Sequence, residues 1–243
     1  MPPELSVIIP AYNEELRLPK TLEAVLHFLK QQDFTAEILV VDDGSTDGTI
    51  RIVEEFAAAA KKSNIAVRVV NGPHQGKGGA IRHGIQNATG TYLLFTDADN
   101  SIPIEQLDQF WQIRDQYDLI IGSRFLLSSR FKTQKGIRLL TSKLGNMLFR
   151  TLFSLKIADT QCGFKFVRAE AARNVAKQMQ MTGFVYDMEF LVLAHQVGYT
   201  IVELPVDWQD APQSTVRAVQ ASLQASAELL IFWGRNRFRS VTK

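Results

Sequence analysis

The sequence has almost no cysteine, no long apolar run and almost no net charge. Its single cysteine, Cys162, excludes an internal disulfide framework and fits a reducing, cytosol-facing location. No apolar run approaches the roughly 18 residues that a membrane-spanning helix needs. The first strand-like segment begins at Leu5, so we expect no signal peptide. Secreted, disordered and integral-membrane classes are therefore all disfavoured.

The small net charge of +2 conceals an asymmetry along the 243 residues, which otherwise have the composition of a globular protein. Residues 1–118 contain 10 basic and 17 acidic side chains, whereas residues 119–243 contain 17 basic and 8 acidic ones. Eight basic residues and no acid lie between residues 119 and 158, and four basic residues and no acid follow Glu228. Such blocks indicate either a solvated basic face or an anionic partner: phosphate, nucleic acid or a membrane surface.

Short apolar runs alternate with helical stretches through the first half of the chain. The patterns predict strands at residues 5–10, 37–41, 66–70, 91–96 and 118–121, and helices at residues 19–32, 48–62, 76–88 and 103–115. The apolar runs are nearly continuous, as in strands that are covered on both faces. This order predicts a doubly wound, mainly parallel α/β sheet, in which ligands bind beyond the carboxyl ends of the strands.

All five predicted strands are followed by polar or glycine-rich clusters, which would converge on one edge of the sheet. In Asp97-Ala98-Asp99, two carboxylates leave a buried strand, and they repel each other unless a cation lies beside them. A hard divalent ion held by one or two carboxylates plus substrate phosphates is the pattern of Mg²⁺ or Mn²⁺. The alternative is a loop that caps the next helix.

The turn at residues 42–48 allows two interpretations. Its spacing matches an EF-hand loop, but an EF-hand needs a preceding helix, and a strand is predicted here. We therefore favour Asp42 or Asp43 as a hydrogen-bond acceptor for a nucleobase or ribose, with Asp47 capping the next helix. Tyr12 could stack on a nucleobase or could be an ordinary half-buried tyrosine.

Two further clusters suit an anion. The loop at residues 72–78 fails the Walker pattern, but its glycines and Lys77 precede a helix whose free N–H groups would point outward. His74 in this loop has no evident partner. Arg124 could pair with a diphosphate; the alternative is a surface salt bridge, although no acid lies nearby in sequence.

Two apolar segments carry only basic charges, and each is therefore either core or interfacial. The first covers residues 136–157, and the second is residues 229–233, followed by Arg235, Arg237 and Arg239. The occurrence of two such segments favours the surface of an anionic bilayer.

These motifs resemble the inverting family-2 glycosyltransferases with the GT-A fold, a mixed, mainly parallel sheet with helices on both faces. More narrowly, they resemble the dolichyl-phosphate β-glucosyltransferases and their bacterial polyprenyl-phosphate relatives. The resemblance runs from Leu5 to the region of Trp208, with residues 159–165 as its most specific segment. The other motifs that carry it are residues 10–14, 42–45, 71–80, 94–99 and 122–124.

The resemblance implies UDP-glucose as donor, a polyprenyl phosphate as acceptor, and Mg²⁺ or Mn²⁺. It implies that Asp99 and Asp97 bind the metal and that Asp99, Arg124 and Asp187 are catalytic. It assigns substrate binding to Pro10, Ala11, Tyr12, Glu14, Asp42, Asp43, Gly76, Lys77, Asp97, Ala98, Arg130, Arg138, Gln161, Lys165 and Glu189.

The implied organisation is a glycosyltransferase domain over residues 1–210, with a nucleotide-and-metal half (1–125) and an acceptor half (126–210). Residues 211–243 would form an amphipathic, basic helix. The protein is expected at the cytosolic face of a membrane, attached through interfacial helices or a partner. Nucleic acid is disfavoured, because the basic stretch is interleaved with aliphatic residues more than with stacking aromatics.

The nature of the acceptor sets the main alternative. A hydroxyl needs a general base, for which Asp187 or Asp159 is the candidate, whereas a phosphate monoester has a second pKa of about 6 and arrives as an anion. The basic stretch, and the lack of the Gln-x-x-Arg-Trp segment of polysaccharide synthases, favour a lipid phosphate. The other hypotheses are another nucleotide sugar, a sugar-phosphate nucleotidyltransferase, and a non-catalytic nucleotide or calcium sensor at a membrane.

Overall fold

In the computed structural model, the described residues are 2–61, 63–72, 74–129, 131–132, 147, 149–153, 155–183, 185–209 and 228–234. The strands are β1 (Leu5–Ala11), β2 (Ala36–Asp42), β3 (Ala66–Asn71), β4 (Tyr92–Phe95), β5 (Leu119–Ser123), β6 (Phe131–Lys132), β7 (Lys165–Arg168), β8 (Ile201–Pro205) and β9 (Trp208–Gln209). The helices are α1 (Leu18–Leu29), α2 (Thr49–Ala60), α3 (Lys77–Asn87), the 3₁₀ helix η1 (Ile104–Gln106), α4 (Leu107–Gln112), α6 (Ala169–Ala176) and α7 (Tyr186–Val197). Residues 149–153 and 228–234 are also helical.

The predicted α/β sheet is confirmed, and it is mixed. Seven strands lie in the order β3-β2-β1-β4-β7-β5-β8, and only β7 runs antiparallel to its neighbours. A second, small sheet joins β6 to β9. Because β7 is antiparallel, its first residue, Lys165, lies at the edge where the parallel strands end, paired with Phe95 and Ile121. The loop before β7 therefore reaches the edge at which ligands are expected.

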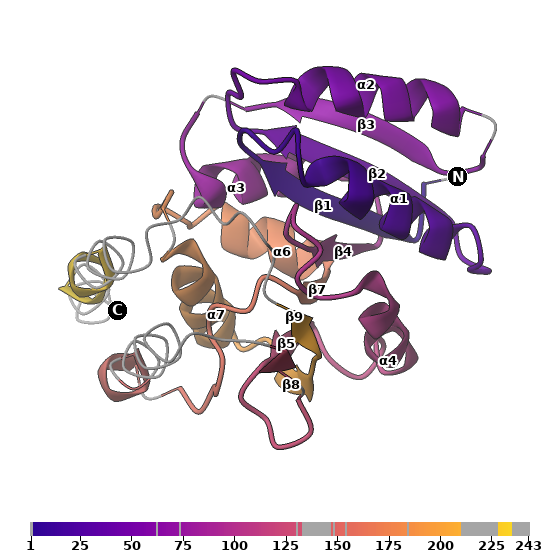
Figure 1. Ribbon diagram of the computed structural model, residues 1–243. Coiled ribbons are helices and arrows are strands. Elements are labelled where there is room, and N and C mark those ends of the chain that lie inside the picture. The colour runs from indigo at the N-terminus through magenta and orange to yellow at the C-terminus, as the bar shows by residue number, and fades with distance from the viewer. Residues whose placement is uncertain are drawn as a thin grey trace.

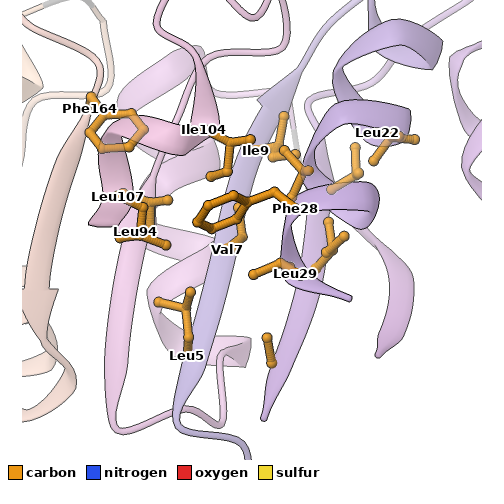
Figure 2. Close-up of a cluster of buried hydrophobic side chains, with 14 of the residues drawn as sticks. Leu5, Val7, Ile9, Leu22, Phe28, Leu29, Leu94, Ile104, Leu107 and Phe164 are labelled. Carbon is orange, nitrogen blue, oxygen red and sulfur yellow. The ribbon is translucent and has the colours of Figure 1, made fainter. Parts of the chain in front are cut away.

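The sheet is buried on both faces, as the continuous apolar runs predict. Val7 and Ile9 of β1 contribute to a core with α1, α2 and α4, whereas Ile8 contributes to a second core with α3, α6 and α7. Figure 1 shows these helices on the two faces of the sheet. In Figure 2, Phe28 of α1 points across Val7 toward Leu107 of α4. Alternate residues of each strand thus anchor opposite helical layers.

A third apolar cluster joins α7 to helical residues 149–153 and 228–234. Phe149 is fully buried in it, and the rings of Phe153 and Phe232 stack with centroids 5.2 Å apart. The described parts of both basic apolar segments therefore pack against α7. No helix of the part of the chain described above is long and apolar enough to cross a membrane.

A buried carboxylate clamps the opposite edge of the sheet, where the parallel strands begin. Glu37 accepts hydrogen bonds from the Ser6 hydroxyl (2.7 Å) and from the backbone and side chain of Thr89 (2.7 Å each), and it pairs with Arg68 at 3.2 Å. Burial alone would raise the pKa of Glu37, but these hydrogen bonds and the Arg68 charge outweigh it and hold the pKa below 4.5.

The lowered pKa of Glu37 predicts a pH dependence of stability. Its contribution to the free energy of unfolding should be complete above about pH 4.5 and should be lost as the pH falls through the lower, folded-state pKa. We therefore expect wild type to lose more stability than Glu37→Gln between pH 6 and about pH 3, measured by urea unfolding at several pH values. Parallel pH profiles of the two proteins would contradict this role.

Candidate active site

Contacts between loops bring the polar clusters together at the carboxyl edge of the sheet. The Asn13 side chain, after β1, accepts the backbone N–H of Thr46, after β2, at 2.8 Å. Lys77, the first residue of α3, places its Nζ 2.6 Å from Oδ1 of Asp97, which follows β4. Neighbouring clusters are thus joined directly, and they form one continuous polar surface.

The two aspartates at the end of β2 have different surroundings. Asp43 accepts backbone N–H groups at both carboxylate oxygens, from the two residues before Lys77, at 2.8 and 2.7 Å. Asp42 uses only Oδ2, which accepts the N–H groups of Gly44 and Ser45 at 3.0 Å each. Its Oδ1 is buried and has no hydrogen-bond partner among the described residues. Asp43 therefore supports the loop, and Asp42 retains an acceptor for a ligand.

Two aromatic rings lie beside this acceptor. Ala11 pairs with Asp42 in the sheet, so Tyr12 emerges next to the β2 turn, and its side chain is 48% exposed. The Tyr12 and His74 rings are 4.9 Å apart, and His74 Nδ1 also contacts the Asp43 carbonyl oxygen. No partner for His74 could be predicted from the sequence, because these contacts join segments more than thirty residues apart.

The EF-hand interpretation of the β2 turn does not fit the structure. The turn follows a strand, and Asp47 accepts the N–H of Thr49, the first residue of α2, at 2.9 Å and the N–H of Glu15 at 3.2 Å. Asp43, which would be the first calcium ligand, is occupied by N–H groups. Asp47 therefore supports the start of α2 through the N–H of Thr49, although the N-cap residue itself is Gly48 and not Asp47 as predicted.

The start of α3 differs from the anion site that the sequence predicts. Gly76 has a φ of 81°, a value that favours glycine, and its N–H donates to Asp43 at 2.7 Å. The N–H of Gly78 donates to the Thr182 carbonyl at 2.8 Å. These two N–H groups thus have protein acceptors, and the Lys77 ammonium is the cationic group at this helix end. Burial lowers the pKa of Lys77, but Asp97 and Asp187 outweigh it and raise that pKa above its ordinary value.

Asp97 and Asp99 lie together but have separate partners. Ion pairing with Lys77 outweighs burial and lowers the pKa of Asp97. Asp99 Oδ1 accepts the N–H and hydroxyl of Ser101, at 3.0 and 2.6 Å. Asp99 Oδ2 accepts no hydrogen bond among the described residues and lies 3.6 Å from Nη1 of Arg17. The intervening Ala98 is buried, which orients the two carboxylates from one fixed turn.

Arg124 has a buried partner that lies far from it in the sequence. Its Nε and Nη2 donate to Asp159 at 2.7 and 2.9 Å, and its backbone N–H donates to the same carboxylate at 2.9 Å. Burial would raise the pKa of Asp159, but the Arg124 charge and hydrogen bonds lower it. The salt bridge predicted as the alternative therefore exists, but it does not lie at the surface. Its acidic partner, Asp159, is fully buried and lies 35 residues from Arg124 in the sequence.

A small, partly open pocket lies between Asp97 and Arg124. Gln161, from the most specific motif, is on its wall. The remaining lining residues come from two loops and β9, and they are Thr96, Ser101, Ile102, Gly163, Phe164 and Trp208.

At the first residue of β7, Lys165 forms an ion pair with Asp187 that is almost fully buried, with side-chain exposures of 1% and 5%. Lys165 Nζ also donates to the Cys162 carbonyl. Glu189, one turn into α7, accepts the N–H groups of Gln180 and Met181. Asp187 and Lys165 thus lie against the site, whereas the described contacts of Glu189 are to the preceding backbone.

Three neighbours of the site were missed from sequence. Arg17 donates two hydrogen bonds to Glu14 and lies near Asp99. Its position at the start of a helix did not indicate a role in the site. Gly163 lies within the most specific motif, and Trp208 lies where the resemblance ends. The resemblance could therefore have indicated both residues. Arg130 and Arg138 lie outside the described residues.

The close approach of Gly163 to Asp97 yields a prediction. A Cβ added at Gly163 would overlap the Asp97 carboxylate, so Gly163→Ala must displace that carboxylate from Lys77. We expect the sugar transfer that the resemblance implies to fall at least about tenfold in kcat/KM, since small misplacements of reacting groups are costly. Gly234→Ala is the control, because an added Cβ there meets nothing within 4 Å. Wild-type transfer by Gly163→Ala would show that Asp97 need not be held.

The fold matches that of GT-A glycosyltransferases. Glucosyl-3-phosphoglycerate synthase from Mycobacterium tuberculosis, solved in complex with UDP, superposes with a TM-score of 0.67 at 19% sequence identity, over 96% of this chain and 80% of that chain. A complex of the same enzyme with Mn²⁺, UDP-glucose and phosphoglyceric acid also gives a TM-score of 0.67.

Residues 6–175 match the family model of Glycosyl transferase family 2. The chain therefore belongs to glycosyl transferase family 2 and is a glycosyltransferase. It is 32% identical to a dolichyl-phosphate beta-glucosyltransferase of Dictyostelium discoideum, over 97% of this chain and 74% of that protein. The identity is 34% to the Drosophila melanogaster protein of the same name, over 96% and 75%, and 33% to the human one, over 93% and 74%.

Proposed function

We propose that this chain transfers glucose from UDP-glucose to a polyprenyl (dolichyl-type) phosphate, with inversion, in a metal-dependent reaction at the cytosolic face of a membrane. The names of the relatives at 32–34% identity support glucosyl transfer to dolichyl phosphate. Complexes of a structural neighbour with Mn²⁺ and UDP-glucose support the choice of donor and ion. The ion pairs of two carboxylates in this chain bear on the acceptor as well.

The observation that most supports a phosphate acceptor is that both candidate bases for a hydroxyl acceptor are paired with largely buried cations. Asp159 is bound through both oxygens by Arg124, and Asp187 is paired with Lys165. The lowered pKa of Asp159 makes that carboxylate a weak proton acceptor, and an oxygen of Asp187 already accepts a hydrogen bond from Lys165. A phosphate monoester arrives already ionised and needs no base. The arrangement therefore favours a phosphate acceptor.

The same cations suit the charges of the reaction. Arg124 lines the pocket, and Lys77 approaches it through Asp97. Fixed positive groups beside the pocket orient an anionic acceptor and stabilise charge that develops on a departing diphosphate. Arg124 is bound to Asp159 through Nε and Nη2, which fixes its guanidinium in one orientation. Asp159 and Asp187 are thereby proposed as positioning residues.

The nucleoside is proposed to lie over β1 and β2. The unpartnered Oδ1 of Asp42 would accept an N–H from the base, and that hydrogen bond would remove the cost of a buried, unsatisfied acceptor. Tyr12 is exposed beside it and offers a ring face for stacking. Asp42→Ala should therefore weaken UDP binding, measured by titration calorimetry, whereas Asp33→Ala, at an exposed position, should leave it unchanged.

The donor set fits Mg²⁺ or Mn²⁺. No group of three or more His, Cys, Asp or Glu side chains is placed to hold a metal in the described part of the chain, so a closed protein cage does not form there. Asp99 Oδ2 is a carboxylate oxygen without a hydrogen-bond donor among those residues, with Asp97 two residues away. One or two carboxylates plus substrate phosphates is how these ions bind. When bound, the ion supplies charge stabilisation for the leaving diphosphate.

The proposed step is a direct displacement. An oxygen of the lipid phosphate forms a bond to the anomeric carbon of glucose while the bond from that carbon to UDP breaks, which inverts the configuration. UDP leaves with the bonding electron pair, and no proton transfer is required. Lys77 and Arg124 orient the anionic groups, and the buried Lys165–Asp187 pair holds the floor of the site.

Membrane contact is proposed through the two packed helical segments. Met147, Leu230 and Ile231 are exposed at 64%, 52% and 52%, and Leu127 in the loop after β5 is fully exposed. Arg150 is exposed on the first segment, and arginines follow the second in the sequence. Apolar residues flanked by basic ones suit the surface of an anionic bilayer.

The buried Cys162, whose pKa burial raises to about 12, remains a thiol under reducing conditions.

The test is a transfer assay with radiolabelled UDP-glucose, GDP-mannose or UDP-GlcNAc, a polyprenyl phosphate, and Mn²⁺ or Mg²⁺. Organic-extractable label from UDP-glucose is expected. The matched acceptor is the corresponding free polyprenol, which retains the chain but replaces the phosphate with a hydroxyl, and it should receive no label. Transfer to the polyprenol with a pH–rate profile that titrates a base would overturn the phosphate-acceptor proposal.

A further inference from the structure

The carboxylate proposed to bind the metal faces a cation of the protein itself. Arg17, the residue before α1, forms a two-donor ion pair with Glu14 and places Nη1 3.6 Å from Oδ2 of Asp99. All three side chains are largely buried, with exposures of 18% for Arg17, 12% for Glu14 and 22% for Asp99. Screening by solvent is therefore weaker here than for an exposed pair. Oδ2 is also the oxygen of Asp99 that Ser101 leaves unbound.

We infer that Arg17 neutralises Asp99 when no nucleotide is present, so that metal binding depends on the arrival of a diphosphate. This inference rests on the proposed function in one respect, the role of Asp99 as metal-binding carboxylate. A divalent ion at Oδ2 would meet the positive charge of Arg17 beside it. The negative charges of a diphosphate would attract Arg17 away from Asp99 or offset its repulsion of the ion.

The charges around Arg17 support this order of events. The cluster contains three carboxylates, Glu14, Asp97 and Asp99, and two cations, Arg17 and Lys77. Lys77 is paired with Asp97 at 2.6 Å, so among the described residues Arg17 is the cation nearest Asp99. The cluster alone carries a single net negative charge and attracts a divalent ion weakly. With a diphosphate present, the ion is drawn by both, and metal and nucleotide bind cooperatively.

The test measures Mn²⁺ binding without any acceptor, by electron paramagnetic resonance of the free ion. In the absence of nucleotide, Arg17→Gln should bind Mn²⁺ about tenfold more tightly than wild type, the size expected for removing a unit charge beside a divalent ion in a partly hydrated site. Saturating UDP should reduce this difference. By linkage, the factor by which Mn²⁺ strengthens UDP binding should fall equally in Arg17→Gln.

Three further variants keep the outcome decisive. Arg17→Lys retains the charge and should remain close to wild type, whereas Arg17→Met is a second neutral variant in case Arg17→Gln does not fold. Arg51→Gln is the control, because Arg51 lies in an exposed pair with Glu55 on α2. Equal or weaker Mn²⁺ binding by both neutral variants, or identical behaviour of Arg17→Lys and Arg17→Gln, would overturn the inference.

These outcomes are separable from the proposed function. Mn²⁺ and UDP binding are measured without a lipid, so a negative result at Arg17 leaves transfer to a polyprenyl phosphate untouched. If Asp99→Ala binds Mn²⁺ in the presence of UDP as tightly as wild type, the metal role of Asp99 itself fails, and the inference fails with it.

Discussion

Asp99→Ala is expected to lower glucosyl transfer to polyprenyl phosphate at least about a hundredfold, the scale on which removing one electrostatic contact to a transition state acts. The physical reason is that Asp99 Oδ2 is the carboxylate oxygen left without a hydrogen-bond donor among the described residues, at the turn that also carries Asp97. Without it, charge on the departing diphosphate is poorly stabilised. The measurement is initial-rate transfer at saturating UDP-glucose and Mn²⁺, with binding of UDP followed separately.

The matched control is Asp33→Ala. Asp33 is exposed between α1 and β2, at the edge of the sheet where the parallel strands begin, so its loss removes one carboxylate far from the site. It should leave transfer within about twofold of wild type, since surface substitutions of this kind rarely matter. Near-normal transfer by wild type in chelator-treated buffer would contradict the metal-dependent account, even if Asp99→Ala were inactive.

Lys165→Met is expected to destabilise the protein by about 3–5 kcal/mol, the cost of leaving one member of a buried ion pair uncompensated. Lys165 and Asp187 are almost completely buried, and Lys165 Nζ also binds the Cys162 carbonyl. Its loss should therefore loosen the loop that carries Gln161 and Gly163, as well as strand β7. Urea unfolding at neutral pH measures the change in the free energy of unfolding.

The double variant Lys165→Met/Asp187→Leu separates pairing from packing. Because apolar residues often replace a buried pair at little cost, it should recover most of the lost stability while transfer remains impaired. Lys20→Met, an exposed position on α1, is the control and should change stability by less than about 0.5 kcal/mol. If Lys165→Met alone were as stable as wild type, Asp187 would not need Lys165 in order to be buried.

Periodicity alone was sufficient for the architecture of the first half. The five predicted strands and the first three predicted helices occur, and the fourth is divided into η1 and the short helix α4. Short apolar runs of β-branched residues and leucine are typical of strands that are covered on both faces of a mainly parallel sheet. The same pattern placed Asp42, Asp97 and Arg124 at strand ends. The antiparallel strand β7 could not be predicted in this way, since its four residues carry no period and its place between β4 and β5 depends on long-range pairing.

The sequence by itself therefore determined which residues of the first half reach the carboxyl edge of the sheet, because strand length and chain order specify that edge there. Only the tertiary structure decided what each of them does there. Asp42 and Asp43 are adjacent and identical, yet one supports a loop and the other retains a buried, unpartnered oxygen. Arg124 finds Asp159, and Arg17 finds Asp99, across 35 and 82 positions. Charge pairing depends on distance in space, and no local pattern encodes that distance.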